Sequence, residues 1–527
     1  MMYVIIHSSK QEACMISFIL GIAALIAGYL IYGKIAEKIF VIKPEIPTPA
    51  IRLADGVDFV PMPTWKTTLI QLLNIAGTGP IFGAIAGALF GPAAFVWIVF
   101  GCIFAGAVHD YMVGMLSVRN DGANISEIVG KYLGQGPRYI MRVFSIVLLI
   151  FVGVVFVTTP AQVLKELYDH ASQLTAGDTL SAVTGNQSSM RFYYIAVAFI
   201  IAYYILATML PIDKLIGKIY PIFGACLLIM AIGITIMMFV SGEITKIPEF
   251  AFKNIRPDKA TNIMGKLFPF LFITIACGAI SGFHATQSPL MARCIRNEKE
   301  GRTVFYGAMI LEGIIAMIWA AVTMAHFNHV GVAGAAVPSA PIIVTRSSVD
   351  YMGWIGGALA IFGVVACPIT SGDTAFRSAR LTIADIFRFD QKPIKNRLFL
   401  AIPLFAVGVL LVLFSISSTK NFNIIWRYFA WSNQTLATIG LWAASAYLAK
   451  SARQYWLTLV PASFMTVVVT SYFFTANECL GPLMTKITGS AGITYATGIV
   501  IGLILSVVLL FLFINFIGIK QKGIIKE

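Results

Sequence analysis

Two short stretches rich in small residues interrupt otherwise apolar segments. The first is NIAGTGPIFG at 74–83, and the second is ACGAISGFHATQSP at 276–289. Glycine and proline favour a helix break, which exposes backbone N–H groups at the start of one half-helix and C=O groups at the end of the other. Because such N–H groups carry partial positive charge and bind anions, the stretches predict an anion-binding site. The alternative is a glycine-rich packing face between helices.

The candidate substrate-binding residues lie in these two breaks and at one later amide. We expect Pro80 to be the first residue of a half-helix, where its missing N–H is not needed. Asn433 and Gln434 are adjacent and point to different faces of a helix, so at most one enters the cavity. The full set is Gly77, Thr78, Gly79, Pro80, Gly278, Ser281, Gly282, His284 and Asn433.

Ionisable side chains also occur inside apolar segments, where they are costly and often functional. Glu312 is a candidate proton carrier, or a structural carboxyl bonded to a neighbouring helix. His284 can move protons near neutral pH, or serve as a hydrogen-bonded core histidine. His109 and Asp110 are interpreted either as a gate or as an interfacial pair that closes the cytoplasmic end.

Membrane-spanning helices must position these side chains. Of the 527 residues, 58% are hydrophobic and only 12% are charged, about half the charged share of a soluble domain. The apolar segments are continuous rather than alternating, which favours helices over a barrel. We predict an all-α polytopic membrane protein with about 13 spans, at 15–32, 67–90, 92–117, 139–163, 192–210, 216–240, 267–285, 303–326, 353–387 (long and interrupted), 398–416, 423–449, 455–475 and 491–518.

The distribution of basic residues predicts the orientation. The net charge of +14 is expected from Lys and Arg in cytoplasmic loops rather than from a nucleic-acid partner. Most basic residues lie inside when the N-terminus is outside and the C-terminus is cytoplasmic. The first span is expected to be retained, with Met15 as an alternative start. The polar segment 164–190 is expected to be an external loop, and Thr158, Thr159, Pro160 and Gln162 are candidates for an outer vestibule.

The two breaks fall in the second and seventh predicted spans. A separation of five spans gives them opposite directions across the membrane, a pattern typical of transporters built from two inverted five-helix repeats. We therefore expect four parts: an extra span and cytoplasmic loop (1–66), a first repeat (67–240), a second repeat (267–449) and two C-terminal spans (450–527).

Five stretches closely resemble the carbon starvation protein A family. The resemblance implies an inner-membrane transporter for peptides or, in some members, a proton-coupled pyruvate transporter, and kinship with the LeuT-type fold. The histidine pair that family members tend to carry before the first break is replaced here by residues 71–74, QLLN, so its proton role does not carry over. The five stretches are TPAIRLADGVDFVP (48–61), NIAGTGPIFGAIAG (74–87), AGAVHDYMVGMLSVRNDG (105–122), LFPFLFITIACGAISGFHATQSP (267–289) and SNQTLA (432–437).

The LeuT-type kinship also implies a cation site. In that fold one later helix supplies cation-coordinating oxygens beside backbone carbonyls of the first broken helix, and CPITSGDTAFRSAR (367–380) is its match. Thr370, Ser371 and Asp373 are thereby implied as ligands of a sodium ion or proton. The alternative is that Ser371 or Asp373 caps a half-helix, with Arg377 neutralising Asp373 one turn away.

Several function classes are disfavoured by missing motifs. There is no Walker-type phosphate loop, no HExxH, no GxSxG and no close CxxC pair among the seven cysteines. We therefore expect no enzyme, no metal and no cofactor. The expected function is secondary active uptake of a small carboxylate, with pyruvate favoured, by proton or sodium symport during carbon starvation. The partners would be the substrate and membrane lipid. The alternatives are peptide uptake and a metabolite sensor that does not transport.

Overall fold

The chain is helical throughout the part that the computed structural model describes. That part comprises residues 16–56, 59–176, 181–209, 212–249, 254, 262–326, 339–387, 389 and 393–524. No β-strand occurs within these residues, which confirms the prediction of an all-α protein.

The helices follow one another with short connections, and short π- or 3₁₀-helical turns (η) join some of them. The first half contains α2 (Ile16–Ala27), η1 (Gly28–Tyr32), α3 (Gly33–Phe40), α4 (Pro49–Arg52), α5 (Thr64–Ile75), α6 (Thr78–Ala88), α7 (Ala93–Gly101), η2 (Cys102–Gly106), α8 (Ala107–Arg119), α9 (Ile125–Leu133), α10 (Gln135–Ala176), α11 (Ser181–Met209) and α12 (Ile212–Val240). The second half contains η3 (Glu243–Lys246), η4 (Ile263–Gly265), α13 (Phe270–Thr274), α14 (Gly282–Ala292), η5 (Glu298–Glu300), η6 (Arg302–Gly307), α15 (Ala308–His326), α16 (Ala340–Leu359), η7 (Ala360–Val365), α17 (Ala366–Phe387), α18 (Ile394–Ile416), α19 (Thr419–Lys450), α20 (Trp456–Thr475), α21 (Gly481–Thr488) and α22 (Ala491–Ile524).

Both predicted helix breaks are present. Helix α5 ends at Ile75 and α6 begins at Thr78, and the two are bent by 52°. Helix α13 is only five residues long, and seven non-helical residues, 275–281, separate it from α14. The expected position of Pro80 is wrong by two residues, because it is the third residue of α6 rather than the first. The third position also lacks an intrahelical acceptor, so proline is tolerated there for the same reason.

The number of spans is lower than expected when length and apolarity alone are counted. Ten helices in the described residues are long and apolar enough to cross a membrane, or eleven if the bent pair α5–α6 is one span. The predicted count of 13 is therefore not confirmed. The spans expected at 267–285 and 423–449 are absent from this set. The first is interrupted, and the second, α19, carries many polar residues.

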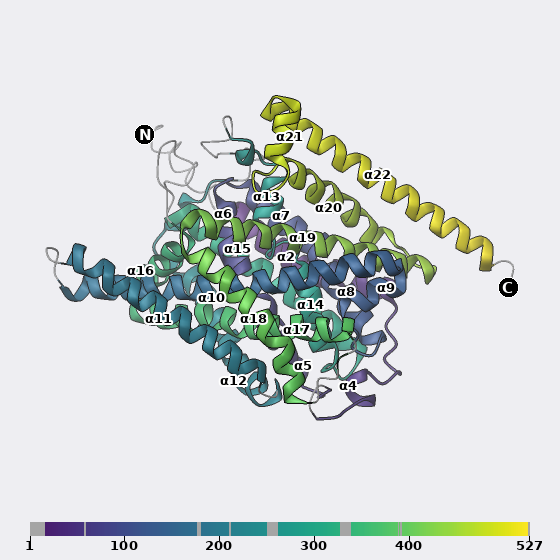
Figure 1. Cartoon of the computed structure of the whole chain (residues 1–527), viewed down its shortest axis with the longest axis horizontal. Helices are drawn as coiled ribbons and strands as arrows, with labels where there is room; N and C mark the ends of the chain where they lie inside the picture. Colours follow the sequence, from purple (N-terminus) through teal and green to yellow (C-terminus); the bar gives the residue numbers. More distant parts are fainter. Residues whose placement is uncertain are drawn as a thin grey trace, which may run out of the picture.

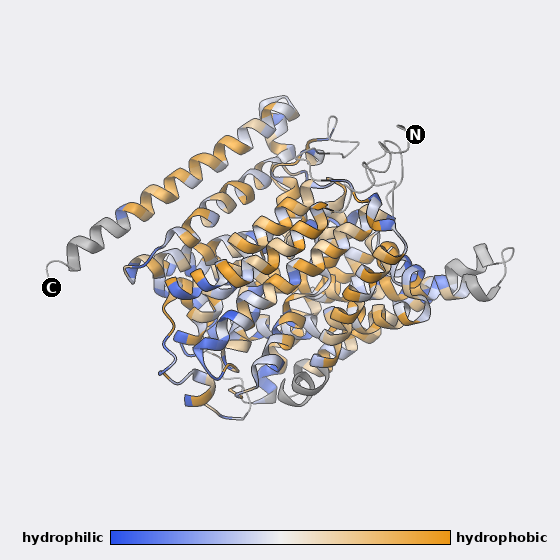
Figure 2. Cartoon of the chain, turned by 180° about the vertical axis from the view of Figure 1, so that it is seen from behind, coloured by the Kyte–Doolittle hydropathy of each residue, from blue (hydrophilic) through white to orange (hydrophobic). Residues whose placement is uncertain are grey.

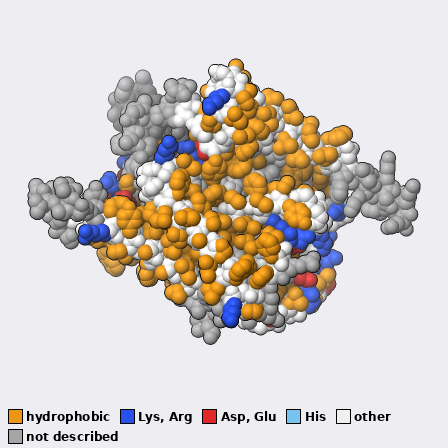
Figure 3. All heavy atoms as spheres, viewed as in Figure 1, with side chains coloured by type: hydrophobic (Ala, Val, Ile, Leu, Met, Phe, Trp, Pro, Cys, Tyr) orange, Lys and Arg blue, Asp and Glu red, His pale blue; other side chains and the backbone are white. Residues whose placement is uncertain are grey.

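Apolar side chains cover the outside of the helix bundle. Figure 2 shows that the long helices are mostly apolar, while hydrophilic residues gather in connecting segments. The space-filling view shows hydrophobic side chains over most of one face (Figure 3), and Trp354, Phe199 and Val240 are among the exposed apolar residues. Because lipid rather than water favours such a surface, these observations indicate a multi-pass membrane protein.

The broken helices lie inside this bundle. Helix α6 packs against α15, and α14 packs against α5, α8 and α19. Helix α22 instead packs along α20 at one edge of the molecule (Figure 1). Only 22% of its most apolar 18-residue stretch is buried. Both breaks therefore lie among other helices in the interior of the bundle.

Two local expectations are wrong. Segment 164–190 is helical rather than a loop in its described residues, because α10 continues to Ala176 and α11 begins at Ser181, while 177–180 lie outside the described residues. Ser371 and Asp373 do not cap a half-helix, because α17 is continuous from Ala366. The interruption of this span occurs earlier, at Gly353, whose φ of 58° is favourable only for glycine.

Candidate functional site

The first break lies directly against the second. A side chain at Gly79 would collide with the Sγ and Cβ atoms of Cys277, and a Cβ atom at Gly83 would lie 3.1 Å from the carbonyl oxygen of Thr274. A Cβ atom at Gly77 would meet the ring of Phe156. The glycines thus permit close approach between helices, so the packing role is observed at each of these three positions.

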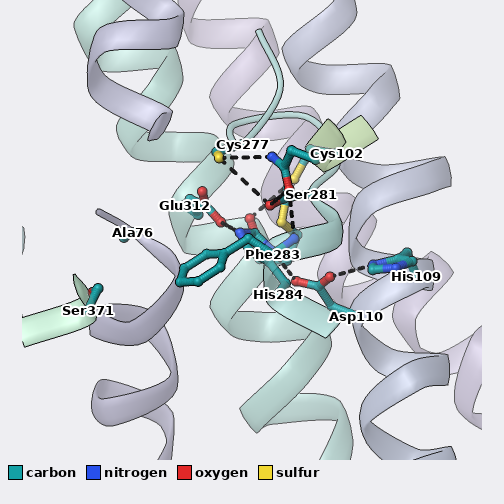
Figure 4. A network of polar contacts seen from close by, with 12 residues as sticks. Ala76, Cys102, His109, Asp110, Cys277, Ser281, Phe283, His284, Glu312 and Ser371 are labelled. Carbon is teal, nitrogen blue, oxygen red and sulfur yellow. Dashed lines mark hydrogen bonds and ion pairs between the residues drawn. The ribbon is translucent and has the colours of Figure 1, made fainter. Parts of the chain in front are cut away.

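The carbonyl end of the first break contacts α17. The Ser371 hydroxyl donates to the Leu73 carbonyl at 2.9 Å, and the Cys367 thiol donates to the Ala76 carbonyl at 3.0 Å. Figure 4 shows Ser371 beside Ala76 at the end of α5. The Thr370 hydroxyl instead bonds within its own helix, to the Cys367 carbonyl at 2.7 Å. Ser371 is therefore the predicted cation-site residue whose side chain reaches the break.

Asp373 points to a different neighbour. Its Oδ2 atom lies 3.7 Å from Nη2 of Arg377, and the same nitrogen donates to the Ala207 carbonyl on α11 at 2.8 Å. The pairing of Asp373 with Arg377 one turn away is thus confirmed. The structure does not bring Asp373 together with Ser371 at the first break.

The N-terminal end of the first break is uncapped. Gly77 precedes α6 and offers no side chain, and no other side chain of the described chain hydrogen-bonds to a backbone N–H group in the first turn of α6. Thr78 approaches Thr159 of α10, with 3.4 Å between their hydroxyl oxygens. The start of α6 therefore retains backbone donors within a buried region.

The second break is capped by the protein itself. The Asn433 Oδ1 atom accepts from the backbone N–H of Phe283 at 2.6 Å and from the Ser281 hydroxyl at 3.0 Å, while its Nδ2 atom lies 3.3 Å from Cys277 Sγ. A side chain at Gly282 would collide with the backbone of α19. One amide oxygen thus occupies a position expected for a substrate carboxylate. A buried amide facing a glycine break is the sequence signal for such a cap.

A chain of four ionisable residues runs beside the second break. Oε2 of Glu312 lies 3.3 Å from Nε2 of His284, and Nδ1 of His284 lies 2.7 Å from Oδ2 of Asp110. The other oxygen of Asp110 lies 2.8 Å from Nδ1 of His109. All four side chains are fully buried, and Figure 4 shows them in sequence.

This grouping of four was not expected from the sequence, which paired His109 with Asp110 and gave Glu312 and His284 separate roles. His109 and Asp110 are both fully buried. Burial is compatible with a gate and with a pair that closes the cytoplasmic end, so both interpretations stay predictions. The order of the helices in the sequence does not reveal that α8, α14 and α15 meet at these positions. Gly278 lies nearby, where an added Cβ atom would collide with Ala316 of α15.

A cavity of about 690 Å³ opens beyond the breaks. It begins at Phe82 and Ile85 of α6 and includes Gln162 of α10, one of the residues expected in a vestibule. Thr158, Thr159 and Pro160 do not line it. Sequence reasoning missed the other polar and aromatic lining residues, which include Lys165, Glu166, Asn423 and Trp426.

Comparison with known proteins identifies the family. The sequence profile described as "Carbon starvation protein CstA" matches residues 13–184, 171–349 and 330–472. An uncharacterized membrane protein of Haemophilus influenzae is 47% identical over 344 residues, which cover 60% of this chain and 92% of the relative. A peptide transporter CstA of Bacillus subtilis is 26% identical, with coverage of 93% of this chain and 95% of the relative.

Two further proteins are similar to this chain, one a relative named as a symporter and the other a solved structure. The pyruvate/proton symporter BtsT of Escherichia coli is 27% identical over 56% of this chain and 47% of its own length. The crystal structure of MhsT in complex with L-phenylalanine matches with a TM-score of 0.54 at 10% identity, over 82% of this chain and 98% of MhsT. This likeness shows a transporter fold of the LeuT type and nothing about the ligand. The chain belongs to the carbon starvation protein CstA family.

Proposed function

We propose that this protein is a secondary active transporter that takes up a small carboxylate, with pyruvate as the favoured substrate, together with a cation. The observation that carries the proposal is the meeting of two broken helices in the buried interior. Helix α6 starts there with uncapped backbone N–H groups, and Gly79 lies against Cys277 of the second break. Helix N-termini bind carboxylates through such groups.

A cation would bind at the opposite end of the same break. The Leu73 and Ala76 carbonyls carry partial negative charge at the end of α5, and Ser371 adds a hydroxyl oxygen. Thr370 and Asp373 remain weaker candidates, because their side chains bond elsewhere. Glu312 is the candidate for a proton. Cation and carboxylate would offset each other's charge and so favour the closed, loaded state.

The proposal includes the arrangement expected from the sequence. Residues 67–240 and 267–449 would form two inverted five-helix repeats, with 1–66 before them and 450–527 after them. The N-terminus would lie outside and the C-terminus in the cytoplasm, in the inner or plasma membrane. Alternating access would then consist of movement of the helices around two breaks at similar depth.

Peptide uptake is the second candidate. The cavity of about 690 Å³ is much larger than pyruvate needs, and it carries both a basic and an acidic side chain, Lys165 and Glu166. A zwitterionic peptide would match these charges by replacing the ion pairs that Lys165 makes with Glu166 and Asp169. The Bacillus subtilis relative named as a peptide transporter also matches nearly the whole chain.

Uptake into proteoliposomes tests the proposal. The purified chain is reconstituted, and accumulation of labelled pyruvate and of a labelled dipeptide is measured with a pH gradient, a sodium gradient or none. We expect pyruvate to accumulate above its external concentration under one cation gradient. Accumulation of the dipeptide alone would favour the second candidate. Binding of either compound without accumulation or exchange would support a sensor and contradict transport.

A further inference from the structure

The four-residue chain beside the second break holds two carboxylates and two histidines. Glu312 and Asp110 can hold one negative charge each, and His284 lies between them within ion-pair distance of both. A protonated His284 balances one of the two carboxylates, so the chain is neutral only when His109 or Glu312 also holds a proton. A net charge in a buried region is costly, so the cluster favours uptake of one further cation.

The hydrogen bonds indicate where that cation binds. Asp110 uses one oxygen for His284 and the other for His109, so its carboxylate is fully partnered. Glu312 is fully buried, yet neither of its oxygens makes a hydrogen bond, and its closest polar contact is the ion pair with Nε2 of His284. Glu312 is therefore the member of the chain with free acceptor capacity.

The surroundings of Glu312 contain no basic side chain that would neutralise it permanently. Neither Lys nor Arg forms an ion pair with the cluster in the described part of the chain. The other titratable groups that face it are thiols: Cys277 ahead of α14, whose Sγ lies within 4.8 Å of the His284 and Glu312 ligand atoms, Cys102 of η2 and Cys367 of α17. Histidine is thus the cluster's only cationic partner in these residues.

Cys277 connects this cluster with the first break. It lies against Gly79 on one side and bonds to the Nδ2 of Asn433 on another, while its sulfur is close to Glu312. A carboxylate bound at the start of α6 would therefore be separated from Glu312 by little more than one side chain. Two negative charges at that separation in a buried site repel strongly unless one is neutralised.

We propose that Glu312 is the residue that carries the coupled proton, and that His284, Asp110 and His109 form the relay that releases it. This inference rests on the proposed function. Protonation of Glu312 would remove the repulsion and permit the substrate carboxylate to bind. Release follows along the observed contacts: His284 passes its Nδ1 proton to Asp110 and takes the Glu312 proton at Nε2. Asp110 then passes a proton to Nδ1 of His109. Nε2 of His109 faces Gly440 of α19 and has no hydrogen-bond partner in the described chain, so it would give up its proton to water that enters when this side opens.

The test separates coupling from transport. Wild type and Glu312→Gln are reconstituted in proteoliposomes with an internal pH dye. Exchange of labelled for unlabelled substrate is measured without a gradient, and accumulation is measured under a gradient of about one pH unit. One coupled proton gives about tenfold accumulation in wild type, since a factor of ten corresponds to about 1.4 kcal/mol. Glu312→Gln is expected to retain exchange, to accumulate substrate only to the external concentration, and to give no substrate-dependent proton flux.

A matched control makes the same chemical change elsewhere. Glu37→Gln removes a carboxylate of α3 that pairs with Arg302 at 3.3 Å, outside both breaks, and it should accumulate substrate like wild type. Failure of wild type to exchange either substrate would contradict the proposed function. Normal exchange with undiminished pH-driven accumulation in Glu312→Gln would overturn only the inference. Loss of exchange in a folded Glu312→Gln would also overturn it, by making Glu312 part of the substrate site.

Two further results would decide against a proton. Accumulation driven by sodium and not by pH would assign coupling to another site. One equivalent of bound zinc in the wild-type protein, lost in Cys277→Ser, would make the Cys277, His284 and Glu312 group a metal site. If Glu312→Gln does not fold, Glu312→Asp replaces it. That variant keeps a carboxyl group and should shift the pH midpoint of accumulation, and an unchanged midpoint would overturn the proposal.

Discussion

The two helix breaks look alike in sequence but differ in how their polar backbone is satisfied. At the first break, Ser371 and Cys367 bond to carbonyls at the end of α5, while the N–H groups at the start of α6 have no side-chain acceptor. At the second, Asn433 supplies the acceptor for the start of α14. The first break thus leaves backbone N–H groups without a side-chain acceptor, whereas the second is capped by the protein and lies beside buried ionisable residues.

The difference indicates that the two breaks have different roles. An uncapped helix start inside a membrane protein is costly unless a ligand meets it at some stage. A capped start is structurally complete without ligand, so its purpose is to hold neighbouring groups in place. Here those groups are His284 and, through Cys277, Glu312. Each of the following predictions tests one side of this contrast.

The largest effect is expected at the contact between the breaks. Gly79→Val introduces a branched side chain where an added Cβ atom already collides with Cys277. Overpacking of this kind costs about 1–3 kcal/mol, equivalent to about a 5- to 150-fold loss of uptake. Proteoliposome uptake measures it, with membrane insertion checked in parallel. Gly136→Val is the control, because Gly136 has no neighbouring atom within 4 Å. Near-normal uptake by the Gly79 variant would exclude the first break from the site.

Removal of the cap should affect stability at the second break. Asn433→Ala leaves the buried N–H of Phe283 and the Ser281 hydroxyl without their acceptor, which costs about 1–3 kcal/mol. Thermal unfolding in detergent, followed by intrinsic fluorescence, should show a lower midpoint. Gln434→Ala removes one longer bond, of 3.3 Å to the Phe272 carbonyl, and should lower the midpoint less. Equal shifts would contradict the special role of Asn433.

A smaller effect is expected at the carbonyl end of the first break. Ser371→Ala removes the donor to the Leu73 carbonyl, a net loss of about 1 kcal/mol or about fivefold in uptake. Thr370→Val should matter less, because the Thr370 hydroxyl bonds only within its own helix. Uptake rates at several sodium concentrations measure both variants. A larger defect in Thr370→Val would reverse the assignment of Ser371 to this break.

The smallest effect on uptake is expected for a residue outside both breaks, where a substitution should change stability alone. Burial raises the pKa of Glu127 on α9, but hydrogen bonds from Arg138 and Arg142 outweigh it, so the pKa is lowered from 4.5. A lowered folded-state pKa gives stability that is present above the unfolded value and is lost as the pH falls through the folded one. The unfolding midpoint should therefore decrease below about pH 4.5, and less so in Glu127→Gln. Uptake at neutral pH should be unchanged.

The sequence predicted the fold class and both breaks because glycine and proline act locally on the backbone. The side chains that contact those breaks were less predictable, because they come from segments that are distant in the sequence. The bond from Asn433 to Phe283 joins residues 150 positions apart, and His284 and Asp110 are 174 apart. Nothing local distinguishes Ser371, which reaches the first break, from Asp373, which turns towards Arg377. Side-chain direction on a continuous helix follows from its rotation, which the hydrophobic pattern of a buried helix leaves undefined.

The 52° bend between α5 and α6 has a mechanical consequence. The twelve residues of α5 form a rod about 18 Å long, hinged at one end near Gly77. A swing of about 10° around that hinge would displace its far end by about 3 Å, roughly the width of a water molecule, while α6 stays still. In an unbroken helix of the same total length, the two ends would have to move together. We therefore expect opening at the α5 side of the break to be a lever movement of α5 alone, with α6 acting as its fixed support.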